Sequence, residues 1–115
     1  MNEEYMDYIE DIIESVEKIK EFTSDMTYEE FLDDKRTVDA VLRNFEVLGE
    51  AAKNIPDRVK ERHNKFPWRE MSGMRDKLIH GYATIDLEII WKTVTGDIPE
   101  LHSKIAELKE ELKKD

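Results

Sequence analysis

The feature that most constrains this chain is a regular apolar repeat over its last third. Large apolar side chains recur at steps that alternate between four and three, namely Leu87, Trp91, Val94, Ile98, Leu101, Ile105, Leu108 and Leu112. This repeat puts every member on one face of an α-helix and suits packing against a long neighbouring helix. Because the repeat continues through Gly96 and Pro99, it predicts one helix over 86–113, with Pro99 as the position for a kink.

Similar apolar spacing predicts helices along the rest of the chain. The long amphipathic stretches cover 3–22, about 34–55 and about 69–80. Thr27 and Glu30 have the spacing of a capping box at the start of a short helix, and Pro56 either ends the second long helix or starts another short one. No stretch alternates apolar and polar residues with period two. We therefore expect an all-α fold, an antiparallel bundle of about four to five helices that forms one domain over 1–115.

The composition narrows the class of protein further. The chain has no cysteine, which excludes disulfides and thiolate metal sites. No apolar run approaches the ~18 residues that a membrane-spanning helix needs, and no apolar run follows a basic start. We therefore expect a soluble, cytoplasmic protein.

The net charge of −10 is distributed unevenly. Residues 1–34 hold 13 acidic and 2 basic side chains, whereas residues 58–80 hold 7 basic and 3 acidic ones. A charged helix face is ordinarily a solvated face, and we interpret the acidic N-terminal segment in that way. For the basic segment, a solvated face and a surface for nucleic acid are equally open interpretations from charge alone.

The basic segment ends in three side chains that suit chemistry on a phosphate. On a helix, Asp76 lies one turn before His80, so its carboxylate can orient the imidazole and favour the protonated ring. His80 also lies at the expected helix end, where the helix dipole favours a cation and Gly81 can take the left-handed conformation of a C-cap. A protonated histidine is a general acid, and the planar fork of Arg75 suits phosphate oxygens. Alone, these residues also fit a surface histidine beside an Arg–Asp ion pair.

The spacing of Arg75 and His80 does not put them on one face of the helix. Five residues correspond to about 140° around the helix axis, so the two side chains point in different directions. Either the long arginine curls back toward the histidine, or a second copy of the protein completes the site across a two-fold axis. We expect the second arrangement.

The residues around these side chains resemble a known family. The stretch Gly73-Met74-Arg75-Asp76-Lys77-Leu78-Ile79-His80-Gly81-Tyr82 closely resembles the R-x4-H-x-Y signature of HEPN-superfamily ribonucleases. Further segments resemble those of HepT toxins, namely Leu48-Gly49-Glu50-Ala51-Ala52-Lys53, Pro67-Trp68 and Asp86-Leu87 followed by Trp91. The resemblance covers nearly the whole chain, although the N-terminal third matches only in its helical pattern.

The resemblance implies a metal-independent endoribonuclease toxin that forms a homodimer and needs no cofactor. Such enzymes use the ribose 2′-OH of the RNA substrate as the nucleophile and leave a cyclic phosphate. By carry-over, Arg75 would stabilise the charge on phosphorus, His80 would move the proton, and Asp76 would occupy the supporting polar position. Tyr82 corresponds to the tyrosine to which the antitoxin MntA, a small nucleotidyltransferase, attaches AMP. Tyr82 could equally pack as an aromatic ring over the helix end.

A second function remains compatible with the sequence. The acidic balance and the small basic area also suit a non-catalytic helical module that docks a nucleotidyltransferase and helps it to hold nucleotide. The intact set of Arg75, Asp76, His80 and Tyr82 favours the nuclease.

Other polar and aromatic residues receive structural interpretations. His63 and His102 lack partners at metal-ligand spacing and are expected at the surface. Trp68 and Trp91 are expected in the core rather than as base-stacking platforms. Glu46 and Glu50 lie one turn apart, as paired catalytic carboxylates can, but we expect them to pair with nearby arginine or lysine.

Overall fold

The computed structural model describes residues 4–81 and 85–114, and these form a helical bundle without a β-strand. The elements in chain order are α1 (Tyr5–Thr23), α2 (Tyr28–Asp33), α3 (Lys35–Lys53), α4 (Asp57–Arg62), α5 (Trp68–His80), α6 (Leu87–Lys92), the π-helical segment η2 (Thr93–Asp97) and α7 (Ile98–Lys114). The all-α prediction is confirmed, and the predicted long helices agree with the observed ones to within a few residues.

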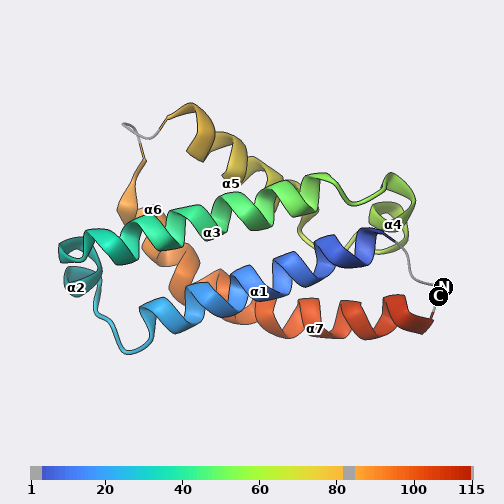
Figure 1. The fold of residues 1–115 in the computed structure, drawn as a ribbon, viewed down its shortest axis with the longest axis horizontal. Helices are drawn as coiled ribbons and strands as arrows, with labels where there is room; N and C mark the ends of the chain where they lie inside the picture. Colours follow the sequence, from blue (N-terminus) through green and yellow to red (C-terminus); the bar gives the residue numbers. More distant parts are fainter. Residues whose placement is uncertain (1–3, 82–84, 115) are drawn as a thin grey trace.

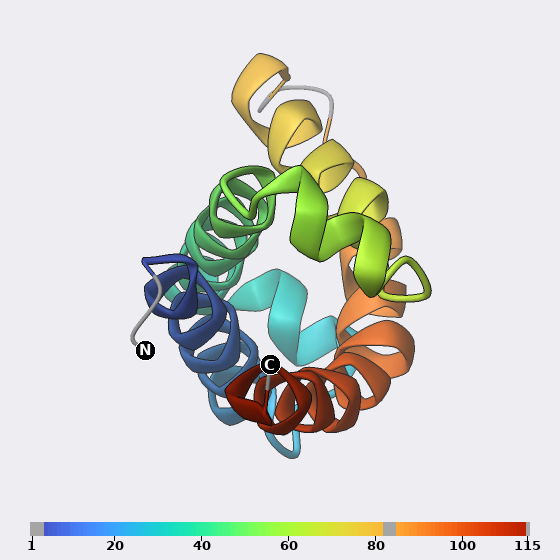
Figure 2. The ribbon, with the colours of Figure 1, turned by 90° about the vertical axis from the view of Figure 1, so that its right-hand side faces the viewer.

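The long helices pack as antiparallel neighbours. Helix α1 lies between α3 and α7, and α5 packs on the side of α3 away from α1 (Figure 1). Each of these neighbours runs opposite to the next, so α1 begins at the same end of the molecule at which α7 ends. The view along the bundle shows α5 standing out from the other long helices (Figure 2). The predicted antiparallel arrangement is therefore confirmed, and α5 is its outermost long helix.

The apolar stripes predicted from sequence form the core. Ile9, Ile12, Val16 and Ile19 of α1 are fully buried, and the stripe of α3 meets them from the opposite side. The repeat of the last helix is buried over Ile98, Leu101, Ile105, Leu108 and Leu112. Burying one such side chain contributes about 1.5–3 kcal/mol, so these stripes hold the bundle together.

The last predicted helix is continuous, but its irregularity begins before Pro99. Over Thr93–Asp97 the helix widens to π-helical geometry, and the N–H of Ile98 donates to the carbonyl of Thr93. A proline has no N–H and its ring crowds the carbonyl one turn earlier, which an inserted π turn relieves. The hydroxyl groups of Thr93 and Thr95 donate to carbonyls one turn back, at distances of 3.0 Å each.

Trp68 belongs to the core, as predicted, whereas Trp91 is only partly buried and packs against the core. Trp68 is 6 % exposed, and its indole N–H donates to the carbonyl of His63 at 3.0 Å. The ring of Trp91 packs against Phe31, with centroids 5.0 Å apart, and against Tyr28 at 6.3 Å. This aromatic cluster attaches the short helix α2 to α6.

Candidate active site

Helix α5 carries the side chains that the sequence singled out. Met71 and Leu78 are buried and anchor its inner face, and α5 spans Trp68–His80, close to the predicted 69–80. The helix ends at Gly81 as predicted, but Gly81 has a φ of −153° and is not in the left-handed conformation. An ordinary helical bond from the N–H of Gly81 to the carbonyl of Lys77 closes the last turn, so a left-handed cap is not needed.

The guanidinium of Arg75 is held between two carboxylates. Its Nε lies 2.9 Å from Oε2 of Glu50 on α3, and its Nη1 lies 3.1 Å from Oδ1 of the neighbouring Asp76. Lys53, one turn after Glu50 on α3, lies 3.9 Å from the same Asp76 oxygen. The Arg75 side chain is 25 % exposed, so part of it stays accessible to a ligand.

A glycine on α3 sets how closely the two helices approach at Arg75. A Cβ atom at Gly49 would lie 2.3 Å from Cβ of Arg75 and 2.7 Å from the carbonyl oxygen of Met71. Real Cβ atoms do not tolerate such contacts, so only glycine permits this packing of α3 against α5. Gly49 therefore places the stem of Arg75 directly on the backbone of α3.

His80 lies in a different environment from Arg75. It is exposed, and its ring has no hydrogen-bond or ion-pair partner among residues 4–81 and 85–114. It borders a hollow of about 440 Å³ between α5 and α6, whose apolar wall includes Met74, Leu78, Ile85 and Ile90. Tyr82, the predicted modification site, lies outside the described residues.

The structure changes the role expected for Asp76. Helical spacing predicts that Asp76 orients His80 one turn later. Its carboxylate is bonded to Arg75 instead, because the adjacent guanidinium and Lys53 from α3 both lie on its side of α5. Glu50 pairs with an arginine, as expected, whereas Glu46 has no such partner in the described part of the chain.

Within one chain, Arg75 and His80 are not brought together. Arg75 faces α3, whereas His80 borders the hollow between α5 and α6. This agrees with the angular separation expected from their spacing and leaves the site of a single chain in two parts.

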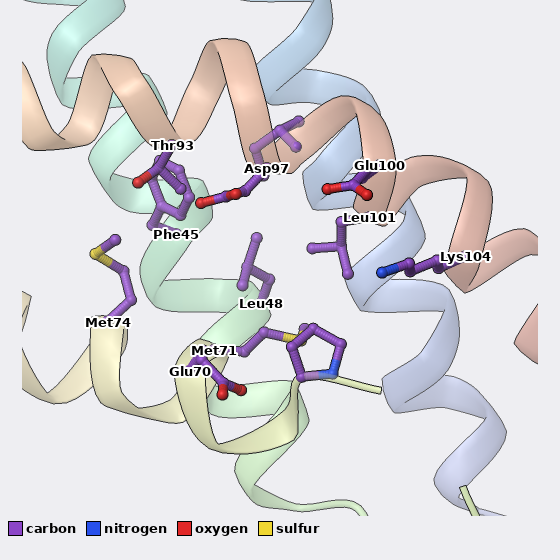
Figure 3. A pocket seen from close by; sticks show the side chains of 12 residues that line it. Phe45, Leu48, Glu70, Met71, Met74, Thr93, Asp97, Glu100, Leu101 and Lys104 are labelled. Atoms are coloured by element: carbon purple, nitrogen blue, oxygen red, sulfur yellow. The ribbon is translucent and has the colours of Figure 1, made fainter. Parts of the chain in front are cut away.

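A second hollow, of about 380 Å³, lies nearer the start of α5, between α3, α5 and the η2–α7 segment, and Met74 borders both hollows (Figure 3). Its apolar surface comes from Phe45, Leu48 and Met71, and its edge carries three carboxylates and one ammonium group, those of Glu70, Asp97, Glu100 and Lys104. An excess of negative charge repels phosphate groups, so this hollow is unsuited to an RNA backbone.

The remaining histidines are engaged elsewhere. His63 Nδ1 lies 3.4 Å from a carboxylate oxygen of Glu111, and His102 lies between Glu17 and Lys20. Across the described residues no group of three or more histidine or acidic side chains could hold a metal ion. None of the helices described is long and apolar enough to span a bilayer.

Sequence reasoning missed two residues that shape the site. Gly49 and Lys53 stand out in the sequence only as part of the segment that resembles HepT toxins. Their contacts with α5 depend on how α3 and α5 cross, which no spacing within either helix reveals.

Comparison with known proteins defines the class to which this fold and site belong. The family described as Ribonuclease HepT-like matches residues 12–108. "Probable ribonuclease HepT" of Thermococcus cleftensis is 50 % identical over 95 % of this chain and 99 % of its own. "Putative RNase MJ0127" of Methanocaldococcus jannaschii is 45 % identical over 88 % of this chain and 84 % of its own. No solved structure matches.

The helical bundle with its R-x4-H pair is thus that of a ribonuclease-like protein. The chain belongs to the HepT-like ribonuclease family.

Proposed function

We propose that this protein is a metal-independent endoribonuclease whose active site combines Arg75 of one copy with His80 of a second copy. The observation that carries the proposal is the division of the two side chains between different surfaces of α5 in a chain of this family. A two-fold dimer allows the parts from two copies to meet.

The proposed reaction needs only proton transfer and charge stabilisation. The ribose 2′-oxygen attacks the adjacent phosphorus while the neutral ring of His80 takes its proton. The bond from phosphorus to the 5′-oxygen then breaks, and the protonated ring of His80 gives the proton to that oxygen. The products are a 2′,3′-cyclic phosphate and a 5′-hydroxyl end. Arg75 donates hydrogen bonds to the phosphate oxygens as negative charge develops on them, and Asp76 supports Arg75 from the same helix.

Cleavage assays with a chelator test this scheme. The wild-type protein with EDTA should cut RNA at the rate seen without it, and the products should carry cyclic phosphate and 5′-hydroxyl ends. Loss of cleavage in EDTA, or 5′-phosphate ends, would show that the chemistry is different.

The protein is further proposed to be the toxin of a toxin–antitoxin pair, silenced at Tyr82 by a MntA-like nucleotidyltransferase. The phenolic oxygen of Tyr82 would attack the α-phosphorus of ATP, lose its proton and release pyrophosphate, which leaves AMP on the ring. The new phosphodiester carries negative charge two residues from His80. It would compete with RNA for Arg75 and block the site by its bulk.

Mass spectrometry after incubation with the nucleotidyltransferase and ATP tests this regulation. The mass should rise by adenylyl units located on Tyr82, with loss of RNA cleavage. Tyr82→Phe should still cut RNA and resist silencing. Label on Tyr5, Tyr8 or Tyr28, or a Tyr82→Phe variant silenced as fully as wild type, would refute the regulatory proposal. Binding of the nucleotidyltransferase by a wild-type chain that cuts no RNA would instead support a docking module.

A further inference from the structure

The pairing of Arg75 with α3 suggests a role for a residue outside the R-x4-H-x-Y stretch. We propose that Glu50 is a positioning residue that holds the guanidinium of Arg75 for phosphate binding, with Gly49 as the position that allows it. This inference rests on the proposed ribonuclease function and deepens it, because it assigns part of the site to α3.

The two hydrogen bonds of Arg75 leave some of its guanidinium N–H donors available to bind a phosphate. An arginine has five N–H donors in one rigid plane. Glu50 accepts from Nε and Asp76 accepts from Nη1, at 2.9 and 3.1 Å. The remaining donors on Nη1 and Nη2 have no described carboxylate, and the plane in which they lie is fixed by the two bonds already made. A phosphate would therefore meet a fork whose orientation is set in advance.

The same side chain is also fixed at its base. Gly49 brings the backbone of α3 against Cβ and Cγ of Arg75, where an added Cβ would lie 2.3 and 3.2 Å away. Glu50 follows directly in sequence, so the close approach of the helices delivers its carboxylate to Nε. Arg75 thus loses its rotamer freedom on folding rather than on binding RNA.

The four charged groups alternate in sign across the two helices. Glu50 and Lys53, one turn apart on α3, flank Arg75 and Asp76, which are adjacent on α5. Without Glu50, the guanidinium would keep only the hydrogen bond to its sequence neighbour Asp76, and no hydrogen bond from α3 would hold the end of the side chain. The Glu50 side chain is 50 % exposed, and ion pairs so exposed contribute little to folding. If Glu50 only formed a surface ion pair, its substitution would therefore have little effect on stability or on the cleavage rate.

The RNA-cleavage kinetics of Glu50→Gln distinguish a positioning role for Glu50 from a simple surface ion pair. The amide keeps the size of the side chain but not its charge. We expect kcat to fall about 10- to 100-fold, because misplacing a group that acts in the transition state costs rates of this order. The melting temperature and KM should change little. Glu46→Gln, one turn earlier on α3, is the matched control and should behave as wild type.

A double substitution shows whether Glu50 acts through Arg75. Catalysis by Glu50→Gln and by Arg75→Lys is compared with catalysis by the variant that carries both changes. In the Arg75→Lys background the change at Glu50 should have no further effect on kcat, because groups that act as a unit are not additive. Wild-type kinetics in Glu50→Gln, or equal losses in both backgrounds, would overturn the positioning role.

A nuclear magnetic resonance measurement tests the contact between Glu50 and Arg75 without an RNA substrate. The Nε–H signal of Arg75 in the nuclear magnetic resonance spectrum, assigned by its absence in Arg75→Lys, should be protected from solvent exchange. Protection should be lost in Glu50→Ala and kept in Glu46→Ala. If Glu50→Ala leaves the signal protected, the proposal is wrong. A wild-type chain that cuts no RNA would overturn the proposed ribonuclease function and the catalytic purpose of Glu50, whereas this signal would still report whether the contact exists.

Discussion

Arg75 and His80 differ in how many contacts they make with the rest of the fold. Arg75 bridges two helices through carboxylates on both, whereas His80 is exposed at the end of α5 with no side-chain partner in the described residues. A substitution at Arg75 therefore changes contacts in the fold as well as the site. A substitution at His80 changes little besides the site.

His80→Ala should remove RNA cleavage and leave the fold intact. Replacing an exposed side chain changes the free energy of unfolding by at most about 0.5 kcal/mol, whereas loss of a general acid or base costs about 10²- to 10⁴-fold in rate. Thermal melting and initial cleavage rates measure the two effects on the same sample. A variant that cuts RNA at the wild-type rate would exclude His80 from the reaction.

Arg75→Lys should lose most of the activity although the charge is kept. An ammonium group is a point donor and cannot bond to Glu50, Asp76 and a phosphate in one plane, as the guanidinium can. We expect kcat to fall at least about 100-fold with a small change in melting temperature. Cleavage within a few fold of wild type would show that charge alone is sufficient.

Two glycines provide a matched test of how α3 and α5 pack. Gly49→Ala should lower the free energy of unfolding by about 1–3 kcal/mol, because its Cβ would collide with Arg75 and Met71. Gly73 lies within α5 with nothing within 4 Å of an added Cβ, so Gly73→Ala should raise stability by roughly 0.5–1 kcal/mol. Urea unfolding measures both changes. A Gly49→Ala variant as stable as wild type would mean that the helices do not approach so closely at this point.

The start of α3 should respond to pH through Asp34. Hydrogen bonds from the hydroxyl and the N–H of Thr37 lower the pKa of the Asp34 carboxyl below its usual value of 3.8. A lowered pKa in the folded state adds stability that is present above pH 3.8 and lost as the pH falls through the folded value. The melting temperature of wild type should exceed that of Asp34→Ala at pH 7, and the difference should shrink below pH 3.8. A difference that does not depend on pH would exclude the ionised cap.

The sequence predicts the elements well because each helix has its own apolar period. The stripes of α1, α3 and α7 locate the core, and Trp68 and Glu50 play the structural roles expected of them. The π turn before Pro99 was not predicted, since the apolar repeat does not report which carbonyl loses its partner. The pairing of Asp76 with Arg75 was the alternative to a contact between Asp76 and His80, and the structure shows this alternative. The contacts of Gly49 and Lys53 with α5 were missed, because they depend on how two helices cross.

At the scale of the whole molecule, the apolar repeat of the last helix is buried in the core of a single chain. Ile98, Ile105 and Leu108 are all buried without a second copy present. A dimer must therefore use another surface. Ile79 and Ile89 are 50 % and 56 % exposed; Ile79 precedes His80 in the sequence, and Ile89 lines the hollow that His80 borders. Exposed apolar side chains at this position suit an interface that closes over the site.

A mixing experiment tests whether two copies share one active site. Arg75→Ala and His80→Ala should each be inactive, because every site in either dimer lacks one side chain. After subunit exchange at equal amounts, half of the dimers contain one subunit of each kind, and one of their two composite sites has both side chains intact. Activity should therefore return to about a quarter of the wild-type value.

Sedimentation should show a dimer at micromolar concentration, with an interface of at least about 1,200 Å², and Ile89→Glu should yield monomers that do not cut RNA. If the mixture stays inactive although the subunits exchange, or if the active protein is a monomer, Arg75 and His80 must act within one chain, and the arginine must leave Glu50 and curl toward the histidine.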